Sequence, residues 1–460
     1  MKKVNRSWKS SRRAFLTRVA SVTGATALNA SLPVWARSED SNQLRGITPI
    51  EGNRFDLTVS AAKPSIDGKA GRAVLINGHL PAPLLRWREG DEVTLNVRNA
   101  LRTDTSIHWH GLLLPFQMDG VPGVSFPGIK PGEQFTYRFP IRQAGTYWYH
   151  SHSGLQEQMG HYGPIIIDPA GADRVQFDRE YVIVLSDWTF ENPHRIFAKL
   201  KKMSDNYNFQ QRTVGDFFDD AESDGLDRTL AERMMWGSMR MNPTDIADVT
   251  GATYTYLING HSPNENWTGL FNPGERVRLR LINASAMSIF NVRIPGLPMQ
   301  VVQSDGLDVR PVETDELQIG TAETFDVVVH PKKHEAYSLV AESNDRSGLG
   351  LATLTPERGL RATVPSLRQR PTLTMKDMAM DHASMGHGET DHAAMDHSTM
   401  DHAAMGHGET DHAAMDHSTM DHAAMGHGET DHAAMDHSTM DHSAMGHGET
   451  DHAAMDHSTM

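Results

Sequence analysis

The 460-residue sequence contains no cysteine. This excludes a disulfide framework, and it also excludes any metal centre that depends on a thiolate ligand. Long apolar runs are scarce as well. Beyond the N-terminal segment, no stretch reaches the roughly 18 consecutive apolar residues that a membrane span requires. We therefore expect a chain without a membrane span, in which metal ligands would have to be histidine, methionine or carboxylate side chains.

Basic residues are missing from one part of the chain. Residues 381–460 contain 16 acidic residues and neither Lys nor Arg. The formal net charge of −15 therefore arises in this segment, and the rest of the chain is almost neutral. This distribution gives no sign of a nucleic-acid surface, so no nucleic-acid partner is expected.

The N-terminus has the pattern of a targeting segment. It reads "MKKVNRSWKSSRRAFLTRVA", which is basic and free of acidic residues. Ser11 to Leu16, "SRRAFL", fits a twin-arginine signal, and Val34 to Ala36, "VWA", fits a cleavage site. We predict a signal peptide over residues 1–36, recognition by the twin-arginine export machinery and a periplasmic mature protein. The alternative is a basic segment without a targeting role.

Between residues 55 and 356 the apolar residues alternate with polar ones. "EVTLNV", "QFTYRF" and "RVRLRL" all show this period of two, and Gly, Pro and Asn separate such runs. Period two with turn residues between the runs predicts β-strands with one buried face. We therefore predict an all-β protein built from antiparallel sandwiches.

The strand pattern starts a second time along the chain. Leu75 to Ala100 begins "LINGH" and continues through a turn into an alternating strand, and Leu257 to Ser285 repeats this order. Self-similarity of this kind predicts two copies of one fold. We place the boundary near Pro169, which gives domains over residues 47–169 and 170–356.

Three further segments differ from the strand pattern. Residues 195–245 are charged and poor in β-branched residues, which predicts a helical insertion. Residues 357–380 form a linker, and residues 381–460 are four copies of a 20-residue unit in which histidine recurs every five residues. A five-residue spacing places these histidines on no common helix face, so we predict a disordered tail.

Two histidine pairs carry the clearest chemical signal. His108 and His110 lie in "TSIHWHGLLL", and His150 and His152 lie in "GTYWYHSHSG". Residues i and i+2 of a strand point to the same face, so each pair projects together, and Trp148 shares the face of the second pair. Imidazole suits Cu, Zn, Fe and Ni. A single pair would also fit an exposed polar strand end, whereas two pairs flanked by aromatic residues predict a metal site.

Longer motifs resemble a known family. "HWHG", "MDGVPGVSFPGIKPGEQFTYRF", "GTYWYHSHSG" and "GPIIID" resemble the first cupredoxin domain of the multicopper oxidases. "NENWTGLFNPGERVRLRLINASAMSIFNVRIPG" and "AETFDVVVHP" resemble the second domain of the periplasmic copper-resistance branch. The resemblance runs from about Ile47 to Met380. It implies two tandem cupredoxin-like Greek-key β-sandwich domains, with copper as cofactor.

The resemblance also implies roles for the histidines. His108 matches the type 2 copper ligand of a trinuclear cluster, and His110, His150 and His152 match type 3 ligands. In the family, a third domain supplies the other half of the cluster and the type 1 copper, whose Cys lies in a His-Cys-His motif. This sequence shows neither that domain nor a Cys. We therefore expect a half-site in a truncated chain that is inactive as an oxidase, with a natural short form as the alternative.

Methionines supply a second set of candidate ligands, because thioethers favour Cu(I) and imidazoles bind Cu(II). A cluster in "ERMMWGSMRMNPTD" fits either a core helix or a Cu(I) site, and the repeats fit either a copper-binding segment or a solvated linker. The cluster consists of Met234, Met235, Met239 and Met241, and representative ligands of the repeats are His382, Met385, His387, His392, Met395, His397 and Met400.

Three functions remain open at this point. The family activity is oxidation of Cu(I) or phenolic substrates with reduction of O2 to water. The alternatives are a non-catalytic protein that sequesters copper through its His/Met-rich tail, and a copper-free structural protein, against which the two retained histidine pairs count. We interpret His161 and His330 as ordinary surface or core residues. Asp119 fits a turn, or a residue that supports a metal ligand or delivers protons.

Overall fold

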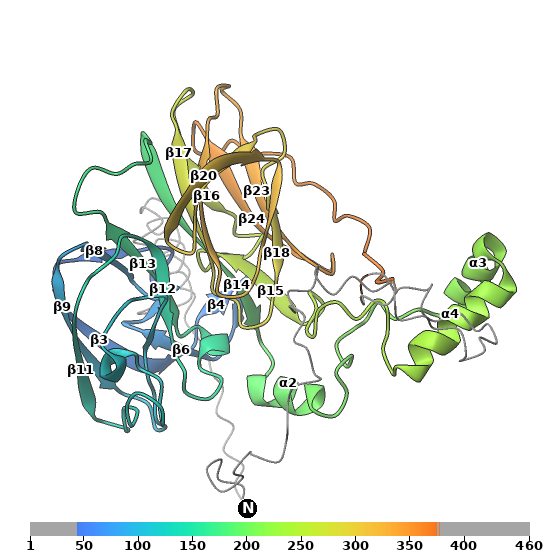
Figure 1. The fold of residues 1–460 in the computed structure, drawn as a ribbon, viewed down its shortest axis with the longest axis horizontal. Coiled ribbons are helices and arrows are strands. Elements are labelled where there is room, and N and C mark those ends of the chain that lie inside the picture. The colour runs from blue at the N-terminus through green and yellow to red at the C-terminus, as the bar shows by residue number, and fades with distance from the viewer. Residues whose placement is uncertain (1–43, 375–376, 378–460) are drawn as a thin grey trace, which may run out of the picture. The chain divides into compact units, whose positions relative to one another are not determined.

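The computed structural model describes residues 44–374 and residue 377, and the fold there is all-β as the sequence predicts (Figure 1). The strands of these residues form four large sheets and one two-stranded ribbon. Two of the large sheets are built from residues 44–168, and the other two from residues 179–355. The predicted signal peptide and the His/Met-rich repeats lie outside the described residues.

Sandwich one pairs a six-stranded sheet, in the order β1-β7-β6-β3-β9-β11, with a five-stranded sheet, in the order β10-β12-β13-β8-β2. Its apolar core draws on the inward residues of both sheets, such as Leu95 of β9 and Ile165 of β13. The elements are β1 (Leu44–Arg45), β2 (Pro49–Glu51), β3 (Arg54–Ala62), β4 (Ser65–Ile66), β5 (Lys69–Ala70), β6 (Ala73–Ile76), β7 (His79–Leu80), β8 (Leu84–Arg88), β9 (Glu92–Asn99), β10 (His108–His110), η2 (Phe116–Met118), β11 (Gln134–Pro140), β12 (Gly145–His150), η3 (Glu157–Met159) and β13 (Tyr162–Asp168).

Sandwich two has the same construction, with sheets in the orders β15-β14-β17-β22-β19-β20 and β16-β24-β23-β18-β21. Leu279 of β17 and Leu339 of β23 share one apolar core, so the two sheets pack face to face. The strands are β14 (Arg179–Thr189), β15 (Tyr254–Ile258), β16 (Trp267–Leu270), β17 (Val277–Asn283), β18 (Phe290–Arg293), β19 (Met299–Ser304), β20 (Leu307–Thr314), β21 (Glu316–Ile319), β22 (Thr324–Val329), β23 (Tyr337–Ser343) and β24 (Leu349–Thr355).

The prediction of antiparallel sandwiches is wrong for part of the strand pairs, because all four large sheets are mixed. In sandwich one, β3 pairs with β9 and β8 pairs with β13 in parallel. In sandwich two, β14 pairs with β17 and β16 with β24 in parallel. The alternation of apolar and polar residues has a period of two in either strand direction, so the sequence pattern does not distinguish the two pairings.

The two "LINGH" copies adopt the same tight turn. Asn77 and Asn259 both have φ of 51°, and the glycines that follow them also have positive φ. Two consecutive residues with positive φ are typical of the Asn-Gly turn that joins antiparallel strands, which explains why both copies use this dipeptide. The side-chain amide of Asn259 donates to the carbonyl oxygen of Val182 and so ties the second turn to β14.

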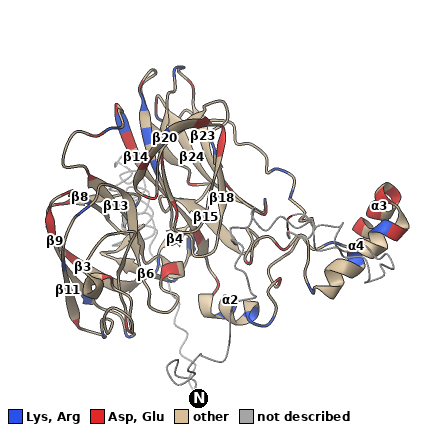
Figure 2. Ribbon diagram, viewed as in Figure 1, with Lys and Arg blue, Asp and Glu red and all other residues tan. Residues whose placement is uncertain are grey.

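Three helices lie between β14 and β15: α2 (Pro193–Leu200), α3 (Val214–Asp224) and α4 (Leu226–Ser238). A capping box between Thr213 and Asp216 starts α3. Acidic residues gather on α3 (Figure 2), and an ion pair of 2.7 Å between Asp220 and Arg233 links it to α4. No helix of the described part of the chain is long and apolar enough to cross a membrane.

Buried charges join the two sandwiches. Arg278 and Arg280 of β17 are fully buried although the alternation places them on the outward face of the strand. Both contact the buried carboxylate of Asp326, and Arg280 donates to the hydroxyl of Thr146 on β12 at 3.0 Å. This polar face of sandwich two therefore meets sandwich one instead of solvent.

Candidate metal centre

Strand register brings the two histidine pairs together. β10 and β12 are antiparallel neighbours, and His108 lies directly opposite His150. Side chains of directly opposite residues share one face of the sheet. The ring centroid of His108 lies 5.5 Å from the centroids of His110 and His150, and 4.7 Å from the centroid of His152. Four imidazoles therefore converge at one edge of sandwich one.

The ring nitrogens are close enough to share a metal ion. One nitrogen from each of His108, His110 and His150 lies within 4.8 Å of the other two. Nδ1 of His110 and Nε2 of His150 are 3.3 Å apart. Imidazole nitrogens at this spacing fit copper, which accepts nitrogen ligands readily, so the residues present are suited to the metal.

Two of the rings are oriented by partners outside the cluster. Nδ1 of His108 lies 2.8 Å from the backbone carbonyl oxygen of Asp119, and Nδ1 of His150 lies 2.7 Å from Oε2 of Glu157. An imidazole that donates through Nδ1 keeps the lone pair of Nε2 for a metal. Asp119 therefore ends η2 in a turn, and its carbonyl oxygen orients His108, whereas a role in proton delivery stays a prediction.

The turn at Asp119 depends on the glycine that follows it. Gly120 has φ of 81°, and a Cβ atom there would lie 1.8 Å from the carbonyl oxygen of Ile107. Only glycine fits such a close approach of two backbone segments. The sequence "MDGVPG" thus brings the carbonyl of Asp119 to His108.

Trp148 packs on two of the imidazoles, and burial favours the neutral form of His110 and His150. Trp148 stacks on His150 with centroids 4.1 Å apart and on His110 at 5.1 Å. Burial, followed by the neighbouring imidazoles, lowers the pKa of His110 to about 4 and that of His150 to about 3. Burial also lowers the pKa of His152 and raises that of Glu157 to about 7. Neutral imidazole is the form that binds metal ions.

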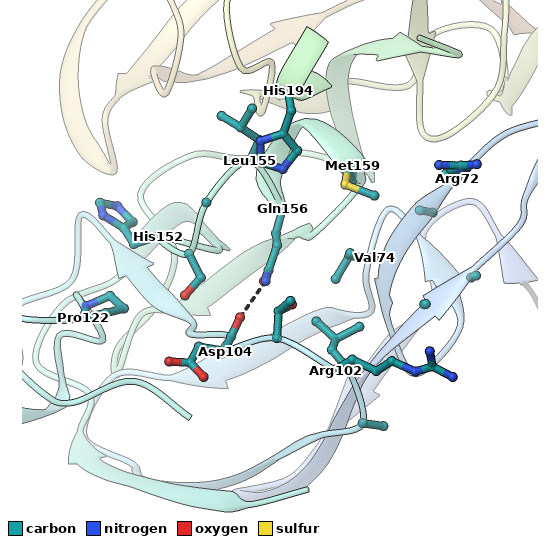
Figure 3. Close-up of a pocket in the computed structure, with 18 of the residues that line it drawn as sticks. Arg72, Val74, Arg102, Asp104, Pro122, His152, Leu155, Gln156, Met159 and His194 are labelled. Carbon is teal, nitrogen blue, oxygen red and sulfur yellow. Dashed lines mark hydrogen bonds between the residues drawn. The ribbon is translucent and has the colours of Figure 1, made fainter. Parts of the chain in front are cut away.

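The fourth imidazole faces a large cavity. His152 is exposed and lines an open cavity of about 1340 Å³ (Figure 3). Gln156 and Met159, which follow it in the chain, line the same cavity, and the amide of Gln156 donates to the carbonyl oxygen of Asp104. The metal centre can therefore be reached from solvent on the side of His152.

Sequence reasoning missed Glu157, and it left open whether His161 is a surface or a core residue. Glu157 lies in "GLQEQMG", whose turn has no periodicity that would show which side chain faces the histidines. His161 is fully buried, and neither of its ring nitrogens has a hydrogen-bond partner among the described residues. His330 is ordinary, with an exposed ring that lies 2.9 Å from the carbonyl oxygen of Gly274.

The methionine cluster is not part of the core. Met234 is 68% exposed and Met241 is 44% exposed, whereas Met235 and Met239 are half-buried. The buried residues of α4 are Thr229 and Trp236. The core-helix interpretation of these methionines is therefore wrong. The structure leaves two thioethers accessible, and the representative tail ligands from His382 to Met400 lie outside the described residues.

Two tandem β-sandwiches with an imidazole cluster where β10 meets β12 are the arrangement of a metalloprotein of the cupredoxin type. Family models described as multicopper oxidase match residues 58–172 and 179–357. The chain therefore belongs to the multicopper oxidase family, whose cofactor is copper, and within it to the copper-resistance branch.

Individual relatives agree with this assignment. Copper resistance protein A of Escherichia coli is 52% identical over 393 residues, which cover 85% of this chain and 63% of that protein. A homologue from Pseudomonas syringae pv. tomato is also 52% identical, over 84% of this chain and 64% of its own length. The chain thus spans less than two thirds of either relative. A laccase from Botrytis aclada matches 72% of this chain and 56% of its own, with a TM-score of 0.53 and 26% identity.

Proposed function

We propose that this chain is a periplasmic copper-binding protein of the multicopper oxidase type that acts in copper resistance. The observation that carries the proposal is the convergence of His108, His110 and His150 at the junction of β10 and β12, with the ring of His152 beside them. The relatives named as copper resistance proteins support the same assignment. The basic segment "SRRAFL" supports export by the twin-arginine machinery, and the matched family models support a division into domains 47–169 and 170–356.

The chain's own residues would hold the metal in a defined geometry. Asp119 and Glu157 fix the protonated Nδ1 atoms of His108 and His150, which leaves both Nε2 atoms free. His110 presents Nδ1 to the same space, and Trp148 limits rotation of the rings that it stacks on. Copper bound there would supply one-electron redox chemistry.

We propose further that these 460 residues by themselves lack oxidase activity. The family activity, oxidation of Cu(I) or phenolic substrates with reduction of O2 to water, uses a type 1 copper held by a Cys. The sequence contains no Cys, and four imidazoles stand where the family uses eight.

The alternative function is copper sequestration without turnover. Residues 381–460 contain 16 His and 12 Met, which together suit both oxidation states of copper. The accessible thioethers of Met234 and Met241 would add a Cu(I) site. Under this alternative the imidazole cluster contributes little of the bound copper.

One experiment separates the two functions. We would load the full chain with Cu(II), remove excess metal by dialysis and compare wild type with the His108→Ala/His150→Ala double variant. We expect wild type to retain a tightly bound copper whose electron paramagnetic resonance spectrum shows nitrogen ligands. The double variant should lose this copper. His330→Ala is the control, since it removes one exposed imidazole remote from the cluster. Equal copper content and equal spectra in all three proteins would show that the cluster does not bind copper.

A further inference from the structure

A glutamine next to the metal centre reaches into the other sandwich. Gln158 belongs to η3 of sandwich one and is only 8% exposed. Its Nε2 donates to the backbone oxygen of Asp187 at 2.9 Å and to the Oδ1 of the same residue at 3.1 Å. Its Oε1 accepts from the hydroxyl of Tyr254 at 2.5 Å. Asp187 lies on β14 and Tyr254 on β15, so every bond of this side chain is made to sandwich two.

Asp187 is a rigid anchor. It is buried, and its carboxylate accepts five hydrogen bonds, one of which comes from Gln158. The other four come from the backbone N–H groups of Ala286, Met287 and Ser288 and from the Ser288 hydroxyl, in the loop between β17 and β18. A buried carboxylate with this many donors is held in one position, because losing any of them would leave an unpaired polar group.

The neighbour of Gln158 in the chain touches the metal centre. Oε2 of Glu157 lies 2.7 Å from Nδ1 of His150. Both residues lie in the single turn of η3, which ends at Gly160 with φ of 98°. Successive side chains of a 3-10 helix point about 120° apart, so a turn held by Gln158 on one side directs Glu157 to another.

We infer that Gln158 is a positioning residue for the metal centre. It anchors η3 to sandwich two, the anchored turn directs the carboxylate of Glu157 at His150, and the carboxylate fixes the tautomer and rotation of that ring. Sandwich two thereby sets the geometry of a ligand that sandwich one carries. The inference rests on the proposed function, because it assigns a role toward the metal that the imidazole cluster would bind.

Loss of the anchor has a defined consequence. When Gln158 no longer bonds to Asp187 and Tyr254, η3 can shift and Glu157 can leave His150. The imidazole then lacks the partner that keeps its proton on Nδ1, and Nε2 is no longer reserved for the metal. Removing an orienting partner of a metal ligand typically weakens metal binding about 10- to 100-fold. We expect about a tenfold loss, since Glu157 itself is retained.

The test compares two buried glutamines in the full chain. Gln158→Leu removes the anchor. Gln303→Leu is the matched control, because Gln303 is also 8% exposed and its amide also makes hydrogen bonds, which go to the side chains of Arg278 and Asp308 and not to Asp187 or Tyr254. Both variants should lower the urea midpoint of unfolding. Only Gln158→Leu should lower the affinity for the copper bound at the imidazole cluster, by about tenfold. This is the copper that the His108→Ala/His150→Ala variant loses, and its nitrogen hyperfine splitting should change as well.

A metal-free readout keeps this inference separate from the proposed function. Nitrogen-15 spectra of the imidazoles should show a proton on Nδ1 of His150 in wild type and in Gln303→Leu, and a mixture of tautomers in Gln158→Leu. If wild type binds no copper at the cluster, the proposed function fails, and a tautomer signal unaffected by Gln158→Leu would overturn the inference independently. Equal copper affinity in both glutamine variants would also overturn it. Should Gln158→Leu not fold, Tyr254→Phe removes only the hydroxyl donor to Gln158, and it must shift both readouts in the same direction.

Discussion

Replacing His161 by leucine should make the metal-free protein less sensitive to acid. The imidazole of His161 is fully buried without a hydrogen-bond partner among the described residues. Burial, with a smaller contribution from His150, lowers its pKa to about 3. In the unfolded chain the same group has a pKa of about 6.5. The unfolded state therefore binds this proton at a higher pH than the folded state does.

The sign and the size of the effect follow from this difference. The contribution of His161 to stability is fully present above about pH 6.5 and is lost as the pH falls toward the folded pKa. At pH 5 the loss amounts to about 2 kcal/mol relative to pH 7.5. At pH 7.5 the leucine variant should be at least as stable as wild type, because it no longer buries two unpaired nitrogens, each of which costs about 1 kcal/mol or more.

Urea unfolding of the metal-free full chain at pH 7.5 and pH 5.0 measures the effect. The stability lost between the two pH values should be about 2 kcal/mol smaller in His161→Leu than in wild type. Ile165→Val serves as the control, because this buried core substitution lowers stability by about 1 kcal/mol equally at both pH values. If wild type and His161→Leu lose the same stability on acidification, the buried imidazole is not the cause and the reasoning is refuted.

Four further outcomes are expected. The copper-loaded chain should consume O2 with Cu(I) or a phenol far more slowly than about 1 s⁻¹, because the sequence has no Cys for a type 1 copper. Enzyme-like turnover measured with an oxygen electrode would contradict the proposed lack of oxidase activity. Arg280→Met should lower the free energy of unfolding by about 3 kcal/mol, because Asp326 loses a buried partner, and an unchanged urea midpoint would argue against the buried cluster. Gly120→Ala should weaken copper binding by displacing the turn that holds His108, which a copper titration against wild type tests. The amount of Cu(II) bound by residues 381–460 should decrease as the pH falls from about 7.5 to about 5.5, because imidazoles protonate near pH 6.5. The amount of bound Cu(I) should change little, because thioethers take up no proton. Equal losses of Cu(I) and Cu(II), measured by dialysis, would contradict the idea that the methionines act as independent ligands.

Local periodicity was enough to predict which residues share a face of a strand. His108 and His110 are two apart, as are His150 and His152, and side chains two apart in a strand point to the same side. The same period identified the all-β class, and it placed Trp148 on the face of the second pair, where its ring stacks on His150. These features depend on residues close together in the chain, so local periodicity is sufficient to predict them.

Strand direction and the partners of the polar faces required the tertiary structure. Alternation in "RVRLRL" places Arg278 and Arg280 outward, but it does not show that this outward face packs against Thr146 of the other sandwich. Likewise, period two fits parallel and antiparallel neighbours equally, and so the mixed sheets were not predicted.

The residues that orient the histidines could be identified only from the tertiary structure. Glu157 and Gln158 lie in a single irregular turn, where no repeat distinguishes a side chain that faces His150 from one that crosses to Asp187. Which way each points depends on where sandwich two packs, and Asp187 follows Gln158 by 29 positions and belongs to a different sheet. Local sequence encodes the alternation of faces, whereas contacts between faces depend on the packing of segments that are distant in the chain. For that reason the shared face of the histidines was predictable, and the residues that orient their rings were not.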